Sequence, residues 1–224
     1  MEVRIRATVD NVITSTTNNP FWYINPEYFK NFSDAERTLK KAQQRFIHGK
    51  QEFVTHYRAR YFTRQSYDYR RMPPFWLISE IFTLEQLLSV CQNLNDKHPA
   101  FLVSAGDNKL NRAAQPFGFN SYGSLVSNLG CILELRNLCA HHSRLWNRNL
   151  KNPSGLKGKH FIHVSHPNRL YSHLLMLRVC CKAQGIADGI EPFMTTMFAS
   201  VPVFARDKAS MGFPPNWQTD SIWA

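Results

Sequence analysis

The sequence lacks the features that mark secreted, membrane-spanning or nucleotide-binding proteins. No apolar run approaches the roughly 20 residues that cross a bilayer, and the N-terminus has no apolar secretory segment. The five cysteines show no paired spacing, which favours reduced thiols over a disulfide framework. There is no internal repeat, low-complexity run or phosphate-cradling glycine loop. We therefore expect a cytoplasmic globular protein without membrane association and without a cofactor.

Acidic residues are also scarce. The 224 residues include 16 acidic and 27 basic side chains, which give a net charge of +11 at pH 7. An excess of this size favours a polyanionic partner, most simply nucleic acid, although a merely soluble basic surface is the alternative. The hydrophobic content of 43% is that of a globular chain, and the length allows one well-formed core.

The hydrophobic periodicity predicts an all-α fold, a bundle of about five or six helices with irregular connections. The expected helices are 2–14, 33–61, 75–94, 121–146, 169–184 and 188–200, with a short one near 109–115. Ser33 and Glu36 match a capping box, Gly49 is a weak point in the helix that follows, and Gly185 is expected to end another helix. The helix at 75–94 is the most apolar and is expected to be central.

We expect one domain over residues 1–224, with an extended C-terminal tail over 201–224. This tail is rich in proline and carries three aromatic residues as candidate anchors: Phe213, Trp217 and Trp223.

The stretch from Arg37 to Arg71 combines basic charge with aromatic rings. It has ten Lys or Arg residues and two acidic ones, a local balance of +8. Interleaved rings and cations suit RNA, whose bases stack on aromatic side chains. Three basic residues of this stretch are predicted to bind substrate phosphates: Lys40, Lys41 and Arg45. The alternative is that the rings face the core and the charges face water.

One segment, 135–148, concentrates groups that transfer protons and bind anions. It reads LRNLCAHHSRLWNR, with three arginines and two adjacent histidines. If the helix continued to Trp146, an apolar face would hold Leu125, Leu129, Ile132, Arg136 and Cys139. A polar stripe would hold Asn137, His141, Arg144 and Arg148. Arg136 would then need an anionic partner or an interface, because an unpaired guanidinium in an apolar sector is costly.

Three interpretations of this segment remain open. It could be an ordinary polar helix end near a buried histidine. A zinc site could use Cys139, His141 and His142, although their spacing does not match usual ligand patterns. The third is a metal-free phosphodiester site, in which histidine transfers protons near neutral pH and arginine stabilises the charge on phosphorus. A second metal possibility, His160, His163 and His166 on a strand, is weaker still.

The string from Arg136 to Arg148 resembles the signature of the Abi-like (abortive infection) family of bacterial phage-resistance proteins, in the HEPN superfamily. HEPN ribonucleases carry Arg, four to six residues, then His, and here Arg136, Asn137 and His141 match with four intervening residues. Further similar segments are 2–6, 72–76, 122–125 and 211–217. Family members usually have an additional segment before the part that matches Glu2, and we expect this chain to lack it.

The resemblance implies a metal-independent endoribonuclease effector of phage defence, of an abortive-infection or toxin–antitoxin-like kind. His141 would transfer a proton, Arg136 would stabilise the phosphate, and Asn137 would orient the imidazole. The remaining substrate-binding residues would be Arg144, Arg148 and Lys151. The expected supporting residues are His142, Trp146 and Glu80. His142 would act through packing, and Glu80 would either pair with a buried arginine such as Arg136 or reach solvent.

The expected partners are RNA, a second copy of the chain, and an antitoxin protein or regulatory RNA. HEPN domains are helical bundles that commonly pair, so the motif helix would lie at a two-fold interface. A non-catalytic RNA-binding module and a structural dimerisation domain are the alternative functions.

Overall fold

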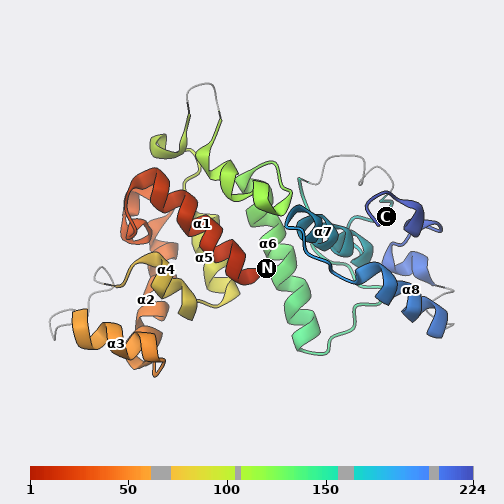
Figure 1. The fold of residues 1–224 in the computed structure, drawn as a ribbon, viewed down its shortest axis with the longest axis horizontal. Helices are drawn as coiled ribbons and strands as arrows, with labels where there is room; N and C mark the ends of the chain where they lie inside the picture. The colour runs from red at the N-terminus through yellow and green to blue at the C-terminus, as the bar shows by residue number, and fades with distance from the viewer. Residues whose placement is uncertain (62–71, 104–106, 156–163, 202–206, 224) are drawn as a thin grey trace. The chain divides into compact units, whose positions relative to one another are not determined.

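A computed structural model gives the fold of the chain and describes residues 1–61, 72–103, 107–155, 164–201 and 207–223. These residues form eight α-helices joined by short 3-10 helices and loops, and within them no strand forms (Figure 1). The predicted all-α class is therefore confirmed. The chain divides into two compact units, Met1–Ala113 and Ala114–Ala224, which we call the N-terminal and C-terminal units and describe separately. The single-domain expectation stays a prediction.

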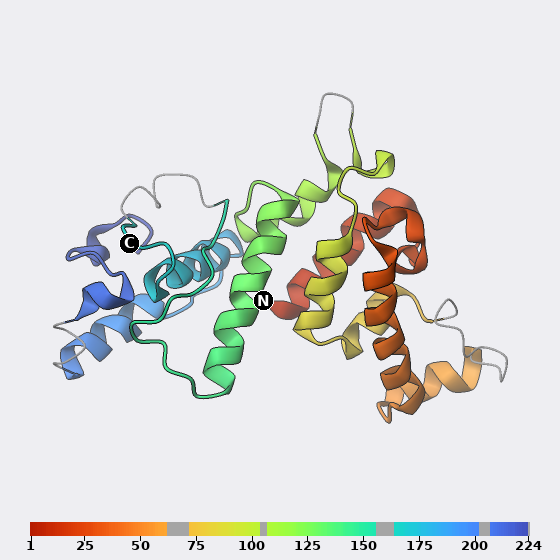
Figure 2. The same ribbon diagram turned by 180° about the vertical axis from the view of Figure 1, so that it is seen from behind.

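The N-terminal unit holds α1 (Glu2–Thr17), α2 (Phe32–His48), α3 (Glu52–Tyr61), α4 (Phe75–Ile78) and α5 (Leu84–Asn93). Helix α1 packs on the 3-10 helix η6 (Lys109–Ala113), and α2 packs on α5 (Figure 2). The core beneath them is strongly aromatic and includes Trp22, Tyr23, Phe46, Phe75 and Phe101, all fully buried. Trp22 and Phe75 lie 4.5 Å apart between ring centroids and join the loop before α2 to α4.

Two of the predicted helices are each divided. The helix expected over 33–61 ends at His48, because Gly49 takes an extended conformation, φ −64° and ψ 142°. It is capped by Asn31, whose side chain accepts a hydrogen bond from the Ser33 backbone N–H at 3.1 Å, so the capping box predicted at Ser33 is wrong. The basic aromatic stretch therefore lies on two helices, and its part at 62–71 is outside the described residues.

The helix predicted over 75–94 is interrupted at Phe82, which is extended at φ −69° and ψ 140°. Thr83 then starts α5 with a capping box. The Thr83 hydroxyl accepts from the Gln86 backbone at 3.2 Å, and the Gln86 side chain accepts from the Thr83 N–H at 3.0 Å. This Thr-x-x-Gln signal is present in the sequence and was overlooked in favour of the apolar run.

The C-terminal unit contains α6 (Tyr122–Ala140), α7 (Leu170–Ala183) and α8 (Ile190–Ser200). Its core joins Leu135 of α6, Leu175 of α7 and Phe198 of α8 to the C-terminal segment. In that segment the three predicted anchors are buried: Phe213, Trp217 and Trp223. Two 3-10 helices, η8 (Lys208–Met211) and η9 (Trp217–Thr219), give this segment local structure.

Before α6, we expected a short helix near 109–115 that stops ahead of Pro116, and the structure differs from this expectation. Pro116 instead lies within the 3-10 helix η7 (Gln115–Phe117), whose first turn tolerates proline. Within the part of the chain that the structure describes, no helix combines the length and the apolar character needed to cross a bilayer.

Candidate functional site at the end of helix α6

Helix α6 carries the motif and begins as predicted. The Ser121 hydroxyl accepts a hydrogen bond from the Ser124 backbone N–H at 3.1 Å, which caps the first turn. Its buried side consists of Tyr122, Leu125, Asn128, Leu129, Cys131 and Leu135. Leu135 is the last of these residues, so the five residues that end the helix, 136–140, extend beyond the buried side.

The helix ends at Ala140, six residues earlier than predicted. His142 donates its backbone N–H to the Cys139 carbonyl at 3.1 Å, and Ser143 donates to the Leu138 carbonyl at 2.8 Å. These two bonds form a Schellman motif, which closes a helix and turns the chain away. The predicted polar stripe is therefore wrong beyond His141, because Arg144 and Arg148 follow the turn instead of continuing the helix.

His142 occupies the position of this motif that glycine usually fills. Its φ of 50° is in the left-handed region, where a side chain costs roughly 1–2 kcal/mol. Asn18 and Asn147 are the other non-glycine residues with positive φ in the described segments, and asparagine tolerates this conformation well. His142 is also exposed, so the expectation that it packs on an apolar side is wrong. Strained backbone conformations cluster at functional sites, so the strained and exposed His142 supports a functional role for this helix end.

Arg136 is exposed, so the prediction that it lies in an apolar sector is wrong. The apolar pattern of the first turns does not extend to it because the core ends at Leu135. Its Nη1 donates to the Asn137 side-chain oxygen at 3.1 Å, which orients the guanidinium. The Asn137 backbone carbonyl accepts the His141 N–H at 3.0 Å. Asn137 thus positions Arg136 through its side chain and His141 through its backbone, whereas we had expected it to orient the imidazole.

His141 itself is exposed and is the C-cap of α6. It follows Arg136 by five positions, so the two side chains leave the helix about 140° apart. Both are accessible to a ligand at the helix end, and neither is part of the core.

The chain after the motif returns along α6 and is held by buried polar groups. Asn128 is fully buried, and its amide binds both the carbonyl and the N–H of Ser154, at 2.7 and 3.0 Å. Glu134 accepts the Lys151 backbone N–H at 2.9 Å. Gly155 has a φ of 67°, and a Cβ there would overlap the Ser124 side chain. These contacts fix the start of the basic loop, with the Lys151 side chain exposed, while residues 156–159 of that loop lie outside the described residues.

A cavity of about 730 Å³ borders the same helix end. Its lining includes Cys139, Arg144 and Trp146, and three methionines of α8 and η8: Met194, Met197 and Met211. Trp146 also packs against the core of the unit, as a supporting residue should. The Arg144 side chain therefore lies between the exposed motif and an apolar cavity.

The other predicted site residues are dispersed. In the N-terminal unit, Lys40 pairs with Glu36 at 3.5 Å and Arg45 binds Gln86 at 2.7 Å, while Lys41 is exposed. Glu80 is exposed, so the alternative that it reaches solvent is confirmed. In the C-terminal unit, Arg148 is exposed. The N-terminal residues belong to a different unit from the motif, and their roles stay predictions.

The buried histidine of this unit is His173 of α7, which the sequence interpretation did not single out. It is fully buried, its Nδ1 donates to the Arg169 carbonyl at 3.3 Å, and its Nε2 has no partner among the described residues. Burial lowers its pKa, because a charged imidazole there would lose its hydration. His173 is therefore a neutral core residue, distinct from the exposed pair His141 and His142.

The cysteines, like the histidines, include buried residues of the core and an exposed residue of the motif. Burial raises the pKa of the Cys131 thiol to about 11 and that of Cys180 to about 12. Cys139, in the motif, is exposed. Within the described segments, no three His, Cys, Asp or Glu side chains lie together so that they could hold a metal ion. Cys139, His141 and His142 are all described, so the zinc alternative is wrong for this arrangement; His160 and His163 of the second alternative lie outside the described residues.

The structure thus defines an all-helical protein with a basic, histidine-bearing helix end. The family model of Abi-like proteins matches residues 1–147, from the first helix to the end of the motif. The chain belongs to the Abi-like protein family, which indicates a role in abortive-infection defence against phage. No curated protein and no solved structure matches the chain.

Proposed function

We propose that the protein is a metal-independent endoribonuclease of the HEPN type, with its site at the end of α6. The observation that supports this most is the exposed pair Arg136 and His141, whose guanidinium and imidazole are held at one helix end by the half-buried Asn137. The strained His142 next to them and the net charge of +11 add to the argument.

The chemistry requires two proton transfers. The ribose 2′-OH attacks the adjacent phosphorus and loses its proton, while the 5′-oxygen leaves and gains one. The products are a 2′,3′-cyclic phosphate and a 5′-hydroxyl. His141 performs one of the transfers, and Arg136 stabilises the extra negative charge on the phosphoryl oxygens.

A single imidazole cannot take one proton and give another in the same step. A two-fold pair of chains supplies the second group, because it brings two copies of the α6 end to one substrate. Exposure of the helix end leaves Arg136 and His141 available to such a pairing. The proposed enzyme is therefore a homodimer with a composite site.

Incubation of purified protein with RNA in EDTA, followed by analysis of the new ends, tests the proposal. We expect cleavage to continue, with 2′,3′-cyclic phosphate at the new 3′ ends and no cleavage of DNA, which lacks the 2′-OH. Loss of activity on chelation and its recovery with zinc would contradict a metal-independent site.

The second candidate is a non-catalytic module that binds a regulatory RNA, and the basic excess favours it equally. It predicts RNA that copurifies with the protein and remains intact. Steep weakening of RNA binding with salt is expected for both candidates, so the products of the cleavage assay separate them.

A further inference from the structure

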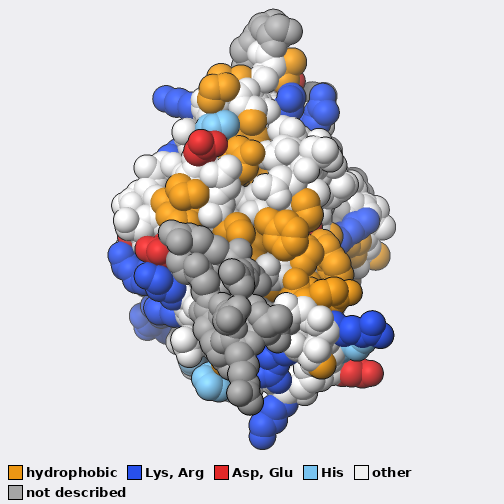
Figure 3. All heavy atoms as spheres, turned by 90° about the vertical axis from the view of Figure 1, so that its left-hand side faces the viewer, with side chains coloured by type: hydrophobic (Ala, Val, Ile, Leu, Met, Phe, Trp, Pro, Cys, Tyr) orange, Lys and Arg blue, Asp and Glu red, His pale blue; other side chains and the backbone are white. Residues whose placement is uncertain are grey.

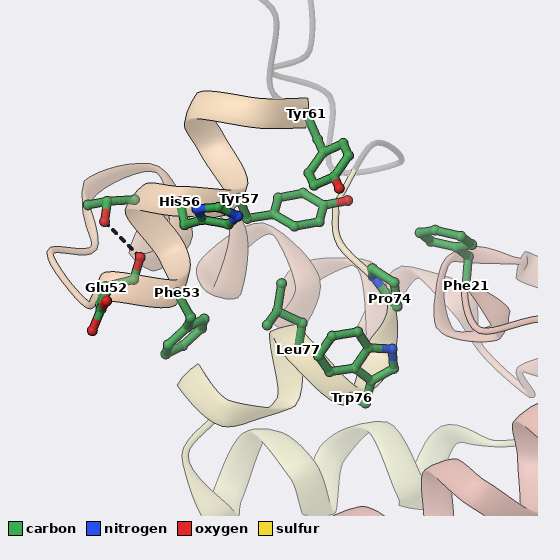
Figure 4. A pocket seen from close by; sticks show the side chains of 10 residues that line it. Phe21, Glu52, Phe53, His56, Tyr57, Tyr61, Pro74, Trp76 and Leu77 are labelled. Atoms are coloured by element: carbon green, nitrogen blue, oxygen red, sulfur yellow. Dashed lines mark hydrogen bonds between the residues drawn. The ribbon is translucent and has the colours of Figure 1, made fainter.

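A wide cleft lies in the N-terminal unit. The residues that line it belong neither to the motif at the end of α6 nor to the groups that carry out the proposed chemistry. The cleft has a volume of about 1160 Å³ and lies between α3, α4 and the segment before η1 (Trp22–Ile24). Its walls carry five aromatic rings: Phe21, Phe53, Tyr57, Tyr61 and Trp76. Figure 4 shows Tyr57 and Tyr61 extending from α3 on one side, with Trp76 opposite and Phe21 at the far end.

Three of these rings are unusually open to solvent for their size. Tyr61 is 66% exposed, Trp76 59% and Phe21 37%. Exposed aromatic rings that gather in one concave site mark a binding surface, since a free monomer gains nothing from leaving them in water. In Figure 3 hydrophobic side chains form a patch on this face of the molecule, and Lys and Arg side chains lie along its border.

The α3 wall is held rigidly. Arg58 donates hydrogen bonds to the Ile47 carbonyl and, at 2.8 Å, to the Gly49 carbonyl, which fastens α3 to the end of α2. The Tyr57 ring packs edge-on against the buried Phe46, 5.8 Å between centroids, and Tyr61 lies 4.9 Å from Tyr57. The rings are therefore arranged before any ligand arrives, which reduces the entropy lost on binding.

The opposite wall is fixed by two bonds to the core. The Phe75 backbone N–H binds the Pro20 carbonyl at 2.9 Å, which holds the residues beside Phe21 against α4. The buried Tyr23 hydroxyl donates to the Pro73 carbonyl at 2.5 Å, next to the start of α4. Trp76 therefore projects from an anchored turn.

Basic residues predominate in the segment that carries the α3 rings, although the cleft lining itself includes the acidic Glu52. Residues 37–61 contain seven Lys or Arg and one acidic residue, Glu52. Lys50 and Arg60 are exposed and form no ion pair within the described residues. Arg60 follows His56 of the cleft by four positions and so lies on the same face of α3.

We propose that this cleft binds single-stranded RNA, with two or more bases stacked on Trp76, Tyr61 and Phe21 and the phosphates near Lys50 and Arg60. Stacking on rings with a basic border is how proteins bind single strands without reading sequence. The charge favours RNA over an apolar helix of a protein partner, which would leave the cations unpaired. This inference rests on the proposed function, which supplies RNA as the ligand, and it adds a substrate-binding surface to that function.

The test is binding of a fluorescently labelled 2′-O-methyl uridine oligomer of about 12 nucleotides to the full chain, followed by anisotropy. This oligomer has no free 2′-OH, so binding is measured whether or not the protein cleaves RNA. Trp76→Ala and Tyr61→Ala should each weaken binding roughly tenfold, and Trp76→Phe should retain most of the affinity because it keeps a ring. Both side chains are exposed, so the fold should survive the changes, which circular dichroism checks.

Ile186→Ala is the control, because Ile186 is 42% exposed, belongs to the C-terminal unit and lines neither this cleft nor the cavity at the end of α6. It should leave affinity unchanged. Tryptophan emission gives a second measure, since Trp22, Trp217 and Trp223 are buried, Trp146 is half-buried and Trp76 is 59% exposed. The quenching caused by the oligomer should be smaller in Trp76→Phe than in the wild type.

Affinity that changes by less than about twofold in Trp76→Ala and Tyr61→Ala would overturn the inference and leave the cleft to a protein partner. Ring-dependent binding without any cleavage of ordinary RNA would support the inference while refuting the proposed nuclease. The two failures are therefore distinguishable.

Discussion

Helices α6 and α7 end in the same backbone arrangement but place different residues in it. At the end of α7, Ile186 donates to the Cys181 carbonyl at 2.9 Å and Gly185 donates to the Lys182 carbonyl at 3.1 Å, the same Schellman pair of bonds as at His142 and Ser143. Gly185, which we predicted to end this helix, has a φ of 65° and meets no steric cost there.

The difference shows which helix end is built for stability and which is not. The end of α7 uses glycine, and its neighbouring polar residue Lys182 binds the Ser221 carbonyl within the unit at 3.4 Å. The end of α6 uses histidine in a strained conformation and presents Arg136 and His141 to solvent. Backbone strain and exposed reactive side chains occur together at the end of α6 and not at the equivalent end of α7. This difference is consistent with selection for function at the end of α6.

Of the substitutions that distinguish the end of α6 from the end of α7, replacement of Arg136 should have the largest effect. Arg136→Ala should lower the rate of RNA cleavage by roughly 10²–10³-fold, the scale expected when one transition-state donor is lost. Arg136→Lys should recover only part of the rate, since lysine lacks the planar fork of donors. Lys182→Ala, at the end of α7, is the matched control and should cleave at the wild-type rate. Light scattering must accompany the assay to show that dimerisation is intact.

The second effect is the pH dependence of stability that the buried histidine of α7 confers. His173 stays neutral in the folded state, because burial lowers its pKa, but in the unfolded chain it takes a proton below about pH 6.5. The unfolded state then binds the extra proton, so stability falls as pH falls. The loss is about 1.4 kcal/mol per pH unit between the two pKa values.

Urea unfolding at about pH 7.5 and about pH 5, on either side of the ordinary histidine pKa, measures this loss. His173→Leu should make the free energy of unfolding less dependent on pH. An equal pH dependence in the wild type and in His173→Leu would show that this histidine does not carry the effect.

The third effect is the free energy of unfolding that is lost because His142 adopts a left-handed conformation. His142→Gly should raise the free energy of unfolding by about 1 kcal/mol, since glycine adopts this φ freely. Gly185→Ala should lower it by about the same amount, because it introduces at α7 the strain that α6 already has. If both substitutions destabilise the protein, His142 makes favourable contacts that outweigh its strain. Cleavage should fall less in His142→Gly than in Arg136→Ala.

The smallest effect concerns the cysteines near the two ends. Cys139 of α6 is exposed, whereas Cys180 of α7 is buried with a pKa raised to about 12. A thiol reagent should modify Cys139 first in the folded protein, and Cys139→Ser should remove this fast phase without changing stability. A fast phase that persists in Cys139→Ser would mean that another thiol is accessible.

The starts of the helices could be predicted from sequence better than their ends. The start of α6 is predicted at 121, because the polar residues Asn120 and Ser121 before an apolar run are a local capping signal. The end of α6 was missed because a Schellman turn without glycine leaves no such signal, and the helical wheel was carried on to Trp146. The exposure of Arg136 could not be predicted either, since it depends on where the surrounding core stops.

The aromatic cleft shows the same limit. The sequence indicated that rings and cations alternate between Arg37 and Arg71, but not which rings reach solvent. The structure buries Phe46 and exposes Tyr61, both on the same stretch, because α2 and α3 separate at Gly49. Trp76 was assigned to a core helix, and its exposure follows from the short length of α4 and the break at Phe82.

The most direct measurement of the central claim is the single-turnover rate of RNA cleavage by wild type and by His141→Ala, in EDTA and at saturating enzyme. We predict a rate roughly 10²–10⁴-fold lower in His141→Ala, the usual scale for losing a general acid or base, with unchanged affinity for the 2′-O-methyl oligomer. Cleavage by pure, folded His141→Ala at the wild-type rate would contradict the claim that the end of α6 is the catalytic site.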